Sequence, residues 1–423
     1  MTSRTRHGRR LEDFRREIYL CSRCNYCRGM VRARDATDLV CPIRENTGGF
    51  DAFTARGRNM IARGILEGKL DPQEATSEFV DALFACTLCG SCQEHCLSLD
   101  PDTWDLFPNN KFTDHKIDAL GIAESLRGII IEKGNPPPAI RQVLHNIQLH
   151  GNPEGKPRSK REEFLEQLDF QVKKACEGKC SSLLYLGSNA SYNQRDQKIV
   201  EAIAKLLHIA GVDFCVLGNE EEDSGSDPLR LGEEGLFEEL ATRNLALFKK
   251  YGFKNIICVS PHDYDALIND YPAYFENESG KLNIKVQHYT EVLADLVKHG
   301  KLKIRHTPGT VVYHDPCYLG RINGVYDAPR DIIKATGAKL AEMRSSRRNS
   351  YCCGGGGGGV WYEALHKPRL QNQRARQACD TGAEILAVAC PICAQMLEDG
   401  LTDSGNCKMQ VLDVAEILLK ACI

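Results

Sequence analysis

The stretch that decides how the first part of this chain folds is Cys86-Thr87-Leu88-Cys89-Gly90-Ser91-Cys92-Gln93-Glu94-His95-Cys96. Its first three cysteines are separated by two residues each, and a fourth follows after three more. At this spacing one tight loop presents successive thiolates to different irons of one cubane cluster, and a more distant cysteine closes the last corner. A similar run stands upstream, where Cys21, Cys24 and Cys27 precede Cys41-Pro42. The sequence therefore predicts two [4Fe–4S] clusters near the N-terminus.

The two runs are expected to exchange their last cysteine. In two-cluster ferredoxins the fourth cysteine of each run ligates the other cube. By that rule the first cube takes Cys21, Cys24, Cys27 and Cys96, and the second takes Cys86, Cys89, Cys92 and Cys41. Zinc is the alternative, because thiolates also suit this metal. A zinc ion closes with four ligands, whereas each run offers three at cubane spacing. The segment from Cys27 to Cys41 is longer than in a minimal ferredoxin.

Composition places the protein in a reducing compartment. The chain has 423 residues, 20 cysteines and a formal net charge of −3, which argues against nucleic acid as its main partner. Its basic start is not followed by an apolar h-region, so we expect no signal peptide, a cytoplasmic location and no disulfides. No apolar run approaches the ~18 residues that span a bilayer. A membrane is therefore expected to be reached only through a partner.

The rest of the chain has the sequence pattern of α/β units. A Pro- and Gly-rich stretch at 134–160 is typical of a linker. Apolar strand candidates follow at 182–186, 255–259, 310–313 and 384–388, and they alternate with helix candidates at 194–210, 235–251, 328–336 and 368–380. Such alternation indicates parallel sheets. We expect a helical two-cluster domain at 1–125, a linker at 126–180, and two further domains at 181–300 and 301–423.

The last two domains are expected to be copies of one unit. Three landmarks of the first copy, at Ser188, Asp223-Ser224 and Ser260-Pro261-His262-Asp263, recur at nearly the same spacing in the second. Their counterparts are Cys317, Cys352-Cys353 and Cys390-Pro391-Ile392-Cys393. One copy is thus rich in cysteine, and the other carries hydroxyls and carboxylates at the matching positions.

The five cysteines of the second copy form a rare pattern. Adjacent cysteines such as Cys352 and Cys353 point apart, so they suit different irons of a larger cluster better than one metal ion. The glycine run 354–359 follows them directly and allows the backbone to pass close to a sulfur-rich object, where a Cβ would clash. A flexible glycine linker is the alternative.

These motifs resemble a known family. His-Asp-Pro-Cys at 314–317, Cys-Cys-Gly at 352–354 and Cys-Pro-x-Cys at 390–393 look like the cysteine-rich CCG domain. A double ferredoxin module followed by two CCG repeats resembles the D-type subunit of heterodisulfide reductase and is related to the glycolate oxidase iron–sulfur subunit. The resemblance implies an α+β protein, with a small α-helical ferredoxin-type domain followed by two repeated α/β CCG domains. It also implies a CCG-bound, non-cubane [4Fe–4S] cluster on Cys317, Cys352, Cys353, Cys390 and Cys393.

The first repeat departs from that family pattern. Ser188, Asp223, Ser224, Ser260 and Asp263 replace all five cysteines, and such side chains are poor ligands for an iron–sulfur cluster. We therefore expect this repeat to hold no cluster, which counts against cleavage of a heterodisulfide between two clusters. His262 is expected to be a hydrogen-bonded structural residue, with a residual polar pocket as the alternative.

The leading hypothesis is an electron-transfer subunit of a larger redox complex. Because no G-x-G-x-x-G follows a strand, we expect no flavin or nicotinamide on this chain, so electrons must come from other proteins, such as a flavoprotein partner, and leave to a terminal acceptor. The alternative is a catalytic disulfide reductase that uses the single non-cubane cluster. A zinc-stapled scaffold is a third possibility. Among the remaining cysteines, Cys215 and Cys258 are expected in the core, and Cys176-x3-Cys180 is expected to bind nothing.

Overall fold

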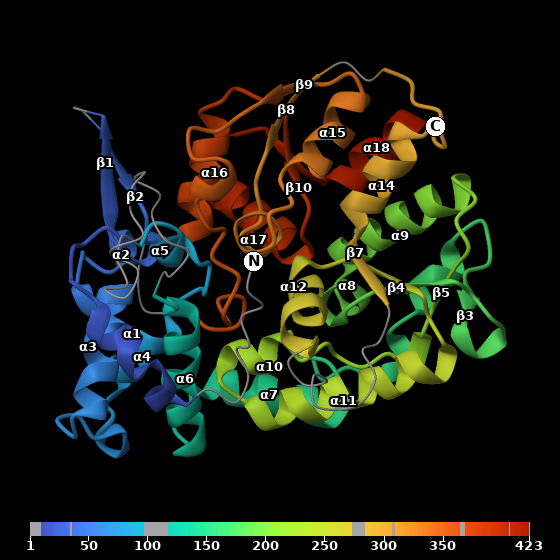
Figure 1. Cartoon of the computed structure of the whole chain (residues 1–423). Helices are drawn as coiled ribbons and strands as arrows, with labels where there is room; N and C mark the ends of the chain where they lie inside the picture. Colours follow the sequence, from blue (N-terminus) through green and yellow to red (C-terminus); the bar gives the residue numbers. More distant parts are fainter. Residues whose placement is uncertain are drawn as a thin grey trace, which may run out of the picture.

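The computed structural model describes residues 10–33, 36–96, 117–272, 284–306, 309–363, 369–405 and 407–422. A helical part, built from the first third of the chain, lies beside two parallel sheets with helices around them (Figure 1). Helix α6 (Ala119–Glu132) of the helical part packs against α10 (Ser226–Leu231) in the first sheet unit. Helix α2 (Pro42–Asn46) packs against α16 (Leu370–Cys379) in the second. The expected α+β class, with one helical domain and two α/β repeats, is confirmed.

The N-terminal part consists of short helices around a small apolar core. Its elements are η1 (Leu11–Phe14), α1 (Arg15–Leu20), β1 (Gly29–Ala33), β2 (Ala36–Leu39), α2, η2 (Asp51–Phe53), α3 (Ala55–Leu66), η3 (Pro72–Glu74), α4 (Ser77–Phe84), α5 (Ser91–Glu94) and α6. Phe14, Leu83, Leu126 and Ile130 are buried at its centre. The antiparallel hairpin β1–β2 occupies the segment between Cys27 and Cys41, which accounts for its unusual length.

The Pro- and Gly-rich stretch is more ordered than the linker we expected. It contains helix α7 (Pro138–His150), which begins with proline at its first position and ends at Gly151, where φ is +69°. Ile140, Val143 and Ile147 lie on one face of α7, at helical spacing, and are buried in the apolar cluster to which α6 also contributes. The linker interpretation of this stretch was therefore wrong for α7, because proline and glycine here delimit a helix rather than exclude one.

The first repeat is built on a five-stranded parallel sheet. Its strands run in the order β3 (Lys173–Lys174), β5 (Phe214–Val216), β4 (Ser182–Tyr185), β6 (Asn255–Cys258) and β7 (Lys285–His288). The longer helices around it are α9 (Gln194–Ile209), α11 (Glu234–Tyr251) and α14 (Tyr289–Lys298), and shorter ones are α8 (Ser188–Tyr192), α10 and α12 (Pro261–Asp265). Single helical turns complete it: η5 (Arg158–Lys160), η6 (Glu163–Gln167), η7 (Ala175–Glu177), η8 (Gly218–Glu220) and η9 (Ala266–Asp270).

The second repeat has the same topology with four strands. Strands β9 (Lys339–Ala341), β8 (Thr310–Tyr313), β10 (Ile385–Val388) and β11 (Gln410–Asp413) stand in the order in which β5, β4, β6 and β7 stand in the first sheet. Its helices and turns are η10 (Tyr318–Ile322), α15 (Asp327–Ala335), η11 (Arg347–Asn349), α16, α17 (Pro391–Ser404) and α18 (Val414–Cys422). The repeat inferred from three landmarks is therefore a repeat of the fold.

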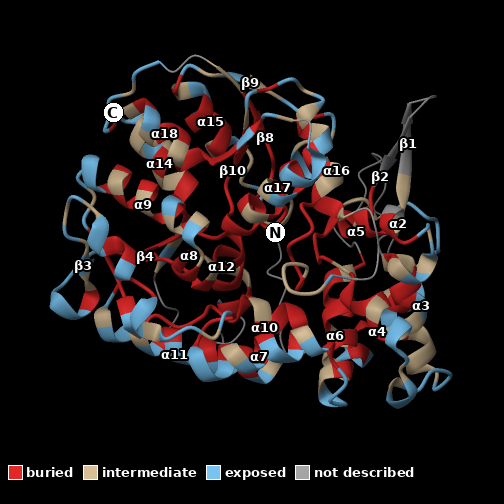
Figure 2. Ribbon diagram, turned by 180° about the vertical axis from the view of Figure 1, so that it is seen from behind, coloured by how far each residue is buried: buried red, intermediate tan, exposed pale blue. Residues whose placement is uncertain are grey.

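The two repeats share one hydrophobic core. Buried side chains of β4, β6, β8 and β10 belong to the same cluster of contacts. Figure 2 shows β4, β8 and β10 buried, while the outer faces of α9 and α11 are exposed. Polar contacts join the repeats as well. The hydroxyl of Tyr289 donates to both carboxylate oxygens of Asp413 at 2.7 Å, and Arg195 Nη2 lies 2.8 Å from Glu416 Oε2. Within the described residues, none of the helices is both long enough and apolar enough to cross a bilayer.

Candidate functional site

The first predicted quartet surrounds a small cavity. Cys21, Cys24 and Cys27 lie in the loop that follows α1, and Cys96 follows α5. All four line one cavity, together with Cys92. Arg23 and Asn25 have φ values of 59° and 70°, and left-handed residues of this kind turn a loop sharply. The structure thus brings together the four cysteines that the spacing rule assigns to the first cube.

The second predicted quartet lines a neighbouring cavity. Cys41 lies at the start of α2, Cys86 and Cys89 lie between α4 and α5, and Cys92 lies in α5. These four side chains line the same cavity. Cys41 therefore crosses from the first run to the second site, as Cys96 crosses to the first. Since Cys92 lines both cavities, the two sites share a wall.

An arginine that the sequence did not single out lines the second cavity. Arg58 is 3% exposed, and its Nε donates to the Ala82 carbonyl at 2.9 Å. Its Nη2 has no hydrogen-bond partner among the described residues. A buried cation with a free N–H group is costly unless a negative group meets it. The donor set therefore fits a cube whose four thiolates make it net negative.

The five cysteines of the second repeat meet at one edge of its sheet. Cys317 follows β8, Cys352 and Cys353 follow β9, and Cys390 and Cys393 follow β10 at the start of α17. The carboxyl ends of parallel strands lie at the same edge of a sheet, which is why residues so far apart in sequence converge here. All five are at most 8% exposed.

The thiols of this quintet form a continuous chain of contacts. Cys393 Sγ lies 3.4 Å from Cys353 Sγ, and the Gly354 N–H donates to Cys352 Sγ at 3.3 Å. Hydrogen bonds link Cys317 to Cys352, Cys352 to Cys353, Cys353 to Cys393 and Cys393 to Cys390. They lower the pKa of Cys352 and Cys353 and raise that of Cys317 and Cys393. A chain of five linked sulfurs, with an N–H aimed at one of them, fits a cluster better than a single ion.

His314 is a further polar group at the quintet. A ring nitrogen of His314 and the sulfurs of Cys353 and Cys393 all lie within 4.8 Å of one another. Arg374 Nε donates to His314 Nδ1 at 3.0 Å, which fixes the ring. His314 stood in the His-Asp-Pro-Cys motif, but its approach to cysteines from two other segments could not be read from that motif.

The second quartet and the quintet are in direct contact. Cys89, Cys317 and Cys352 pack together in one small buried cluster with Tyr318. A hydrogen bond with the Cys352 thiol is the largest cause of the raised pKa of Cys89. Arg321 spans the same junction, because its Nη1 donates to the Cys89 carbonyl at 2.8 Å and its Nη2 to the Ser350 carbonyl. No feature of the sequence predicted which of the two quartets would face the quintet.

The first repeat has a closed hydrogen-bonded arrangement at the position equivalent to the quintet. Ser188 Oγ donates to Asp223 Oδ2 and Ser224 Oγ donates to Asp263 Oδ1, both at 2.5 Å. Ser260 caps the following helix by accepting from the His262 N–H at 3.2 Å. Burial raises the pKa of Asp263 to about 8. These groups satisfy one another and offer no soft ligand, which supports the expectation that this repeat binds no cluster.

His262 lies at the boundary between the repeats. It is buried, and its ring stacks on Tyr318, the residue after Cys317, with 4.1 Å between ring centroids. Burial lowers the pKa of His262 to about 4, so the ring is neutral at ordinary pH. Its place against Tyr318 is that of a packed structural residue.

Four of the remaining cysteines pair, contrary to the expectation that the protein has no disulfides. The structure bonds Cys180 to Cys215 and Cys379 to Cys407. Their Cα atoms are 6.1 and 6.2 Å apart, within disulfide reach, because the sheet places β5 beside the residues before β4 and because Cys407 lies near the end of α16. Cys258 is buried in the core as expected, Cys215 is buried but paired, and Cys176 is exposed and free.

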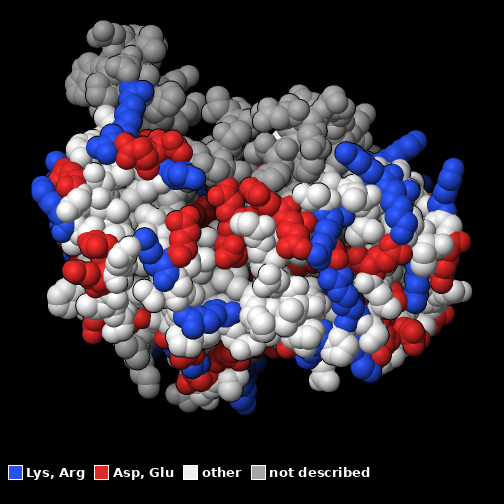
Figure 3. Space-filling view, turned by 90° about the horizontal axis from the view of Figure 1, so that it is seen from below, with Lys and Arg blue, Asp and Glu red and all other residues white. Residues whose placement is uncertain are grey.

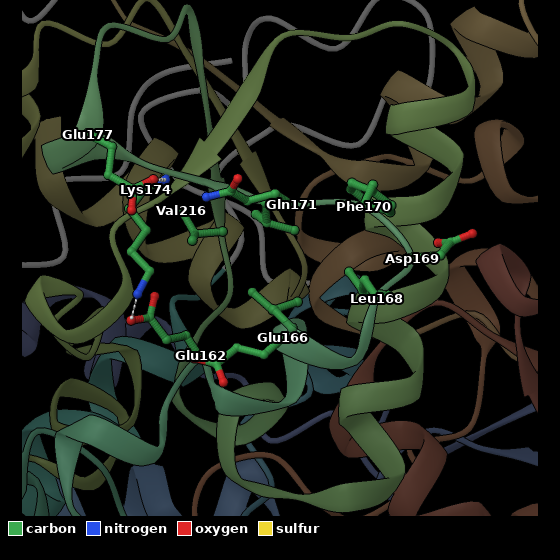
Figure 4. Close-up of a pocket in the computed structure, with 11 residues that line it drawn as sticks. Glu162, Glu166, Leu168, Asp169, Phe170, Gln171, Lys174, Glu177 and Val216 are labelled. Carbon is green, nitrogen blue, oxygen red and sulfur yellow. Dashed lines mark hydrogen bonds and ion pairs between the residues drawn. The ribbon is translucent and has the colours of Figure 1, made fainter.

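A further cavity lies away from the thirteen predicted ligand cysteines. It has a volume of about 510 Å³, and its lining includes Glu162, Glu166, Phe170, Lys174 and Val216 (Figure 4). Its rim is acidic, and the Lys174 ammonium is 2.7 Å from Glu162 Oε1. Since it contains none of the predicted ligands, it is not part of the redox sites.

Comparison with known proteins agrees with this arrangement. The model of the 4Fe-4S dicluster domain matches residues 17–98, and that of the cysteine-rich CCG domain matches residues 186–262 and 311–398. The D-type subunit of the dihydromethanophenazine:CoB–CoM heterodisulfide reductase of Methanosarcina mazei is 33% identical, over 83% of this chain and 80% of the relative. This chain belongs to the family of heterodisulfide reductase D-type subunits. The second matched CCG segment contains all five cysteines of the quintet, and the first contains four of the five Ser/Asp counterparts and ends one residue before Asp263.

Longer relatives share the same modules. A probable iron-sulfur-binding oxidoreductase, FadF, of Bacillus subtilis is 33% identical over 98% of this chain, and the EtfAB:quinone oxidoreductase of Syntrophomonas wolfei is 35% identical over 81%. The chain spans 62% of the first and 46% of the second. This chain is therefore an oxidoreductase-type iron–sulfur protein, and its Methanosarcina mazei homologue is a subunit of a heterodisulfide reductase.

Proposed function

We propose that this heterodisulfide reductase homologue transfers electrons within a larger redox complex, between a flavoprotein partner and a terminal acceptor. The observation that carries the proposal is the contact between Cys89 and Cys352, which joins a cubane-type site to the CCG site inside one chain. The first quartet adjoins the second through Cys92, and the second adjoins the quintet through Cys89. The three sites thus form a row, as electron transfer by short steps requires.

The ligands in this proposal are thirteen cysteines in three sets. Cys21, Cys24, Cys27 and Cys96 hold the first cubane, and Cys86, Cys89, Cys92 and Cys41 hold the second. The non-cubane cluster takes Cys317, Cys352, Cys353, Cys390 and Cys393. The clusters supply one-electron chemistry, and the chain supplies thiolates, burial and the positive charge of Arg58.

The two ends of this row of sites differ in their exposure to solvent. Cys24, in the first quartet, is exposed, whereas every cysteine of the quintet is buried. Exchange with a flavoprotein is therefore proposed at the first cubane. Lys and Arg are interspersed with Asp and Glu on the face seen in Figure 3, which fits a protein partner better than nucleic acid. We propose that a membrane is reached only through a partner.

A catalytic disulfide reductase is the second candidate, favoured by membership of the heterodisulfide reductase family. The Ser–Asp pairs of the first repeat count against it, because cleavage between two CCG clusters needs soft ligands in both repeats. The two candidates differ in one assay. A purified, cluster-loaded protein with an artificial electron donor should reduce disulfides only if it is catalytic.

The proposed function is tested by iron and sulfide content together with EPR. Anaerobically purified wild-type protein should contain three clusters, and Cys353→Ser should lose one distinctive signal while both ferredoxin-type signals remain. Cys258→Ser is the matched control, because Cys258 is also buried but lies in β6, outside all three sites. A colourless protein that contains zinc, or persistence of every signal in Cys353→Ser, would contradict the proposal.

A further inference from the structure

The glycine run 354–359 is one of the places where the second repeat contacts the N-terminal domain. Residues 354–358 are buried, so the run is not a flexible linker. A Cβ atom on Gly356 would lie 2.8 Å from the Thr87 carbonyl oxygen, and one on Gly357 would lie 2.6 Å from the Cys86 carbonyl oxygen. Close packing leaves no room for such approaches. A side chain at either position would therefore push the two backbones apart.

The run has a second role that its sequence did not suggest. Glycine was expected to allow the backbone to approach a sulfur-rich site, and the Gly354 N–H does donate to Cys352 Sγ. The structure also brings Gly356 and Gly357 against the loop that carries Cys86 and Cys89. Gly357 also has a φ of +58°, which disfavours other residues, whereas Gly356 has no left-handed φ, so its requirement is purely steric.

Arg127 of helix α6 ties three segments together at this contact. Its Nη1 donates to the carbonyls of Gly357 at 2.9 Å and Arg230 at 2.7 Å, and its Nη2 donates to that of Cys86 at 2.5 Å. The side chain is 0% exposed. Within the described part of the chain, all of its hydrogen-bond acceptors are backbone carbonyls. Because the planar fork of arginine holds several acceptors in fixed directions, Arg127 fixes the positions of the three backbones relative to one another.

The segments fixed in this way carry ligands of two different sites. Cys86 belongs to the second quartet, and Cys352 and Cys353 immediately precede the glycine run. The contact between Cys89 and Cys352 lies at the same junction. Any shift of the glycine run against Thr87 must therefore change the separation of the two sites.

We propose that Gly356, Gly357 and Arg127 form a docking clamp that sets the separation between the second cubane site and the five-cysteine site, and so controls electron exchange between them. The three are positioning residues, since they act through the cysteines that their segments carry. The inference rests on the proposed function, because it requires clusters at both sites.

The test compares Gly356→Ala with Gly235→Ala in the full, anaerobically purified chain. Gly235 lies on α11 with only the Glu233 side chain near its Cβ position, so it controls for the substitution itself. Iron content is measured first. EPR then records the magnetic interaction between the reduced clusters, and freeze-quench EPR records how fast one added electron equilibrates between them. At wild-type iron content, Gly356→Ala should weaken the interaction and slow equilibration several-fold, and Gly235→Ala should change neither.

A second variant protects the test against loss of clusters in Gly356→Ala. Arg127→Lys keeps the charge, but a single ammonium cannot reach all the carbonyls of the clamp. It should weaken the same interaction, with Arg243→Lys on the exposed face of α11 as control. If Gly356→Ala or Arg127→Lys keeps wild-type iron content and leaves both the magnetic interaction and the equilibration rate unchanged, the clamp proposal is wrong. A wild-type protein without the five-cysteine signal would instead contradict the proposed function.

Discussion

The thiol of Cys89, in the N-terminal domain, packs against the thiol of Cys352, in the second CCG repeat. This contact makes the second quartet, rather than the first, the neighbour of the quintet. Cys41 belongs to the first run in sequence, but it lines the cavity of the second quartet, which is the site next to the quintet. The order of the three sites leads to predictions that do not depend on knowing the physiological partners.

Substituting serine for each of the two crossed ligands, Cys41 and Cys96, should perturb different clusters. Cys41→Ser should perturb the cubane next to the quintet and remove its magnetic interaction with the five-cysteine cluster. Cys96→Ser should perturb the other cubane and leave that interaction intact, because Cys96 lines the first cavity. EPR of the two reduced variants distinguishes the outcomes. Loss of the interaction in Cys96→Ser alone would reverse the crossed assignment.

Arg58 should raise the reduction potential of the second cubane. Its buried guanidinium lines that cavity, and a positive charge stabilises the more negative, reduced form of a cluster. Arg58→Met should therefore lower the potential of one cubane signal in an EPR-monitored redox titration. Arg63→Met is the control on the same helix, since Arg63 is partly exposed and paired with Glu67. Equal potentials in the wild type and Arg58→Met would refute this role.

Deprotonation of Asp263 in the first repeat should lower the free energy of unfolding of the protein as pH rises. Burial raises the pKa of Asp263 from 3.8 to about 8, so the folded state holds a proton that the unfolded state releases. Its contribution to stability is fully present below about pH 4 and is lost progressively up to about pH 8.

Asp263→Asn removes this titration. One pKa unit corresponds to about 1.4 kcal/mol, so the variant should reduce the decline in unfolding free energy between about pH 5 and pH 8 by more than about 1 kcal/mol. Denaturant unfolding at several pH values measures the effect, with the exposed Asp331→Asn as control. A decline as steep as that of the wild type would show that Asp263 is ionised in the folded protein.

Arg161 should be essential to the stability of the first repeat. Its Nη1 lies 2.8 Å from Glu221 Oε1, and both side chains are 0% exposed. Arg161→Met leaves the Glu221 carboxylate buried without its cation and should cost roughly 3–5 kcal/mol. Arg243→Met, which breaks an exposed pair with Glu239, should cost less than about 1 kcal/mol. Thermal unfolding of the two variants should show this difference, and equal losses would contradict it.

The sequence by itself determined which cysteines group together and that two α/β units repeat. Two-residue cysteine spacing is a local property of a loop, so Cys21, Cys24 and Cys27 could be assigned to one site without a fold. The repeat was visible because the landmark residues follow strands, and strand ends keep their spacing. Two expectations from the sequence were wrong. The Pro- and Gly-rich stretch contains helix α7, and neighbouring strands bring Cys180 to Cys215, where no disulfide was expected.

Only the tertiary structure decided how the sites are joined. The approach of Cys89 to Cys352, the cavity position of Arg58 and the carbonyls gathered by Arg127 depend on how the helical domain docks on the second repeat. Docking is determined by the fit of whole surfaces, to which each residue contributes only its shape and its hydrogen-bonding groups. The glycine run illustrates the difference: its composition showed that something must come close, and the packing showed that this is the backbone of Cys86 and Thr87.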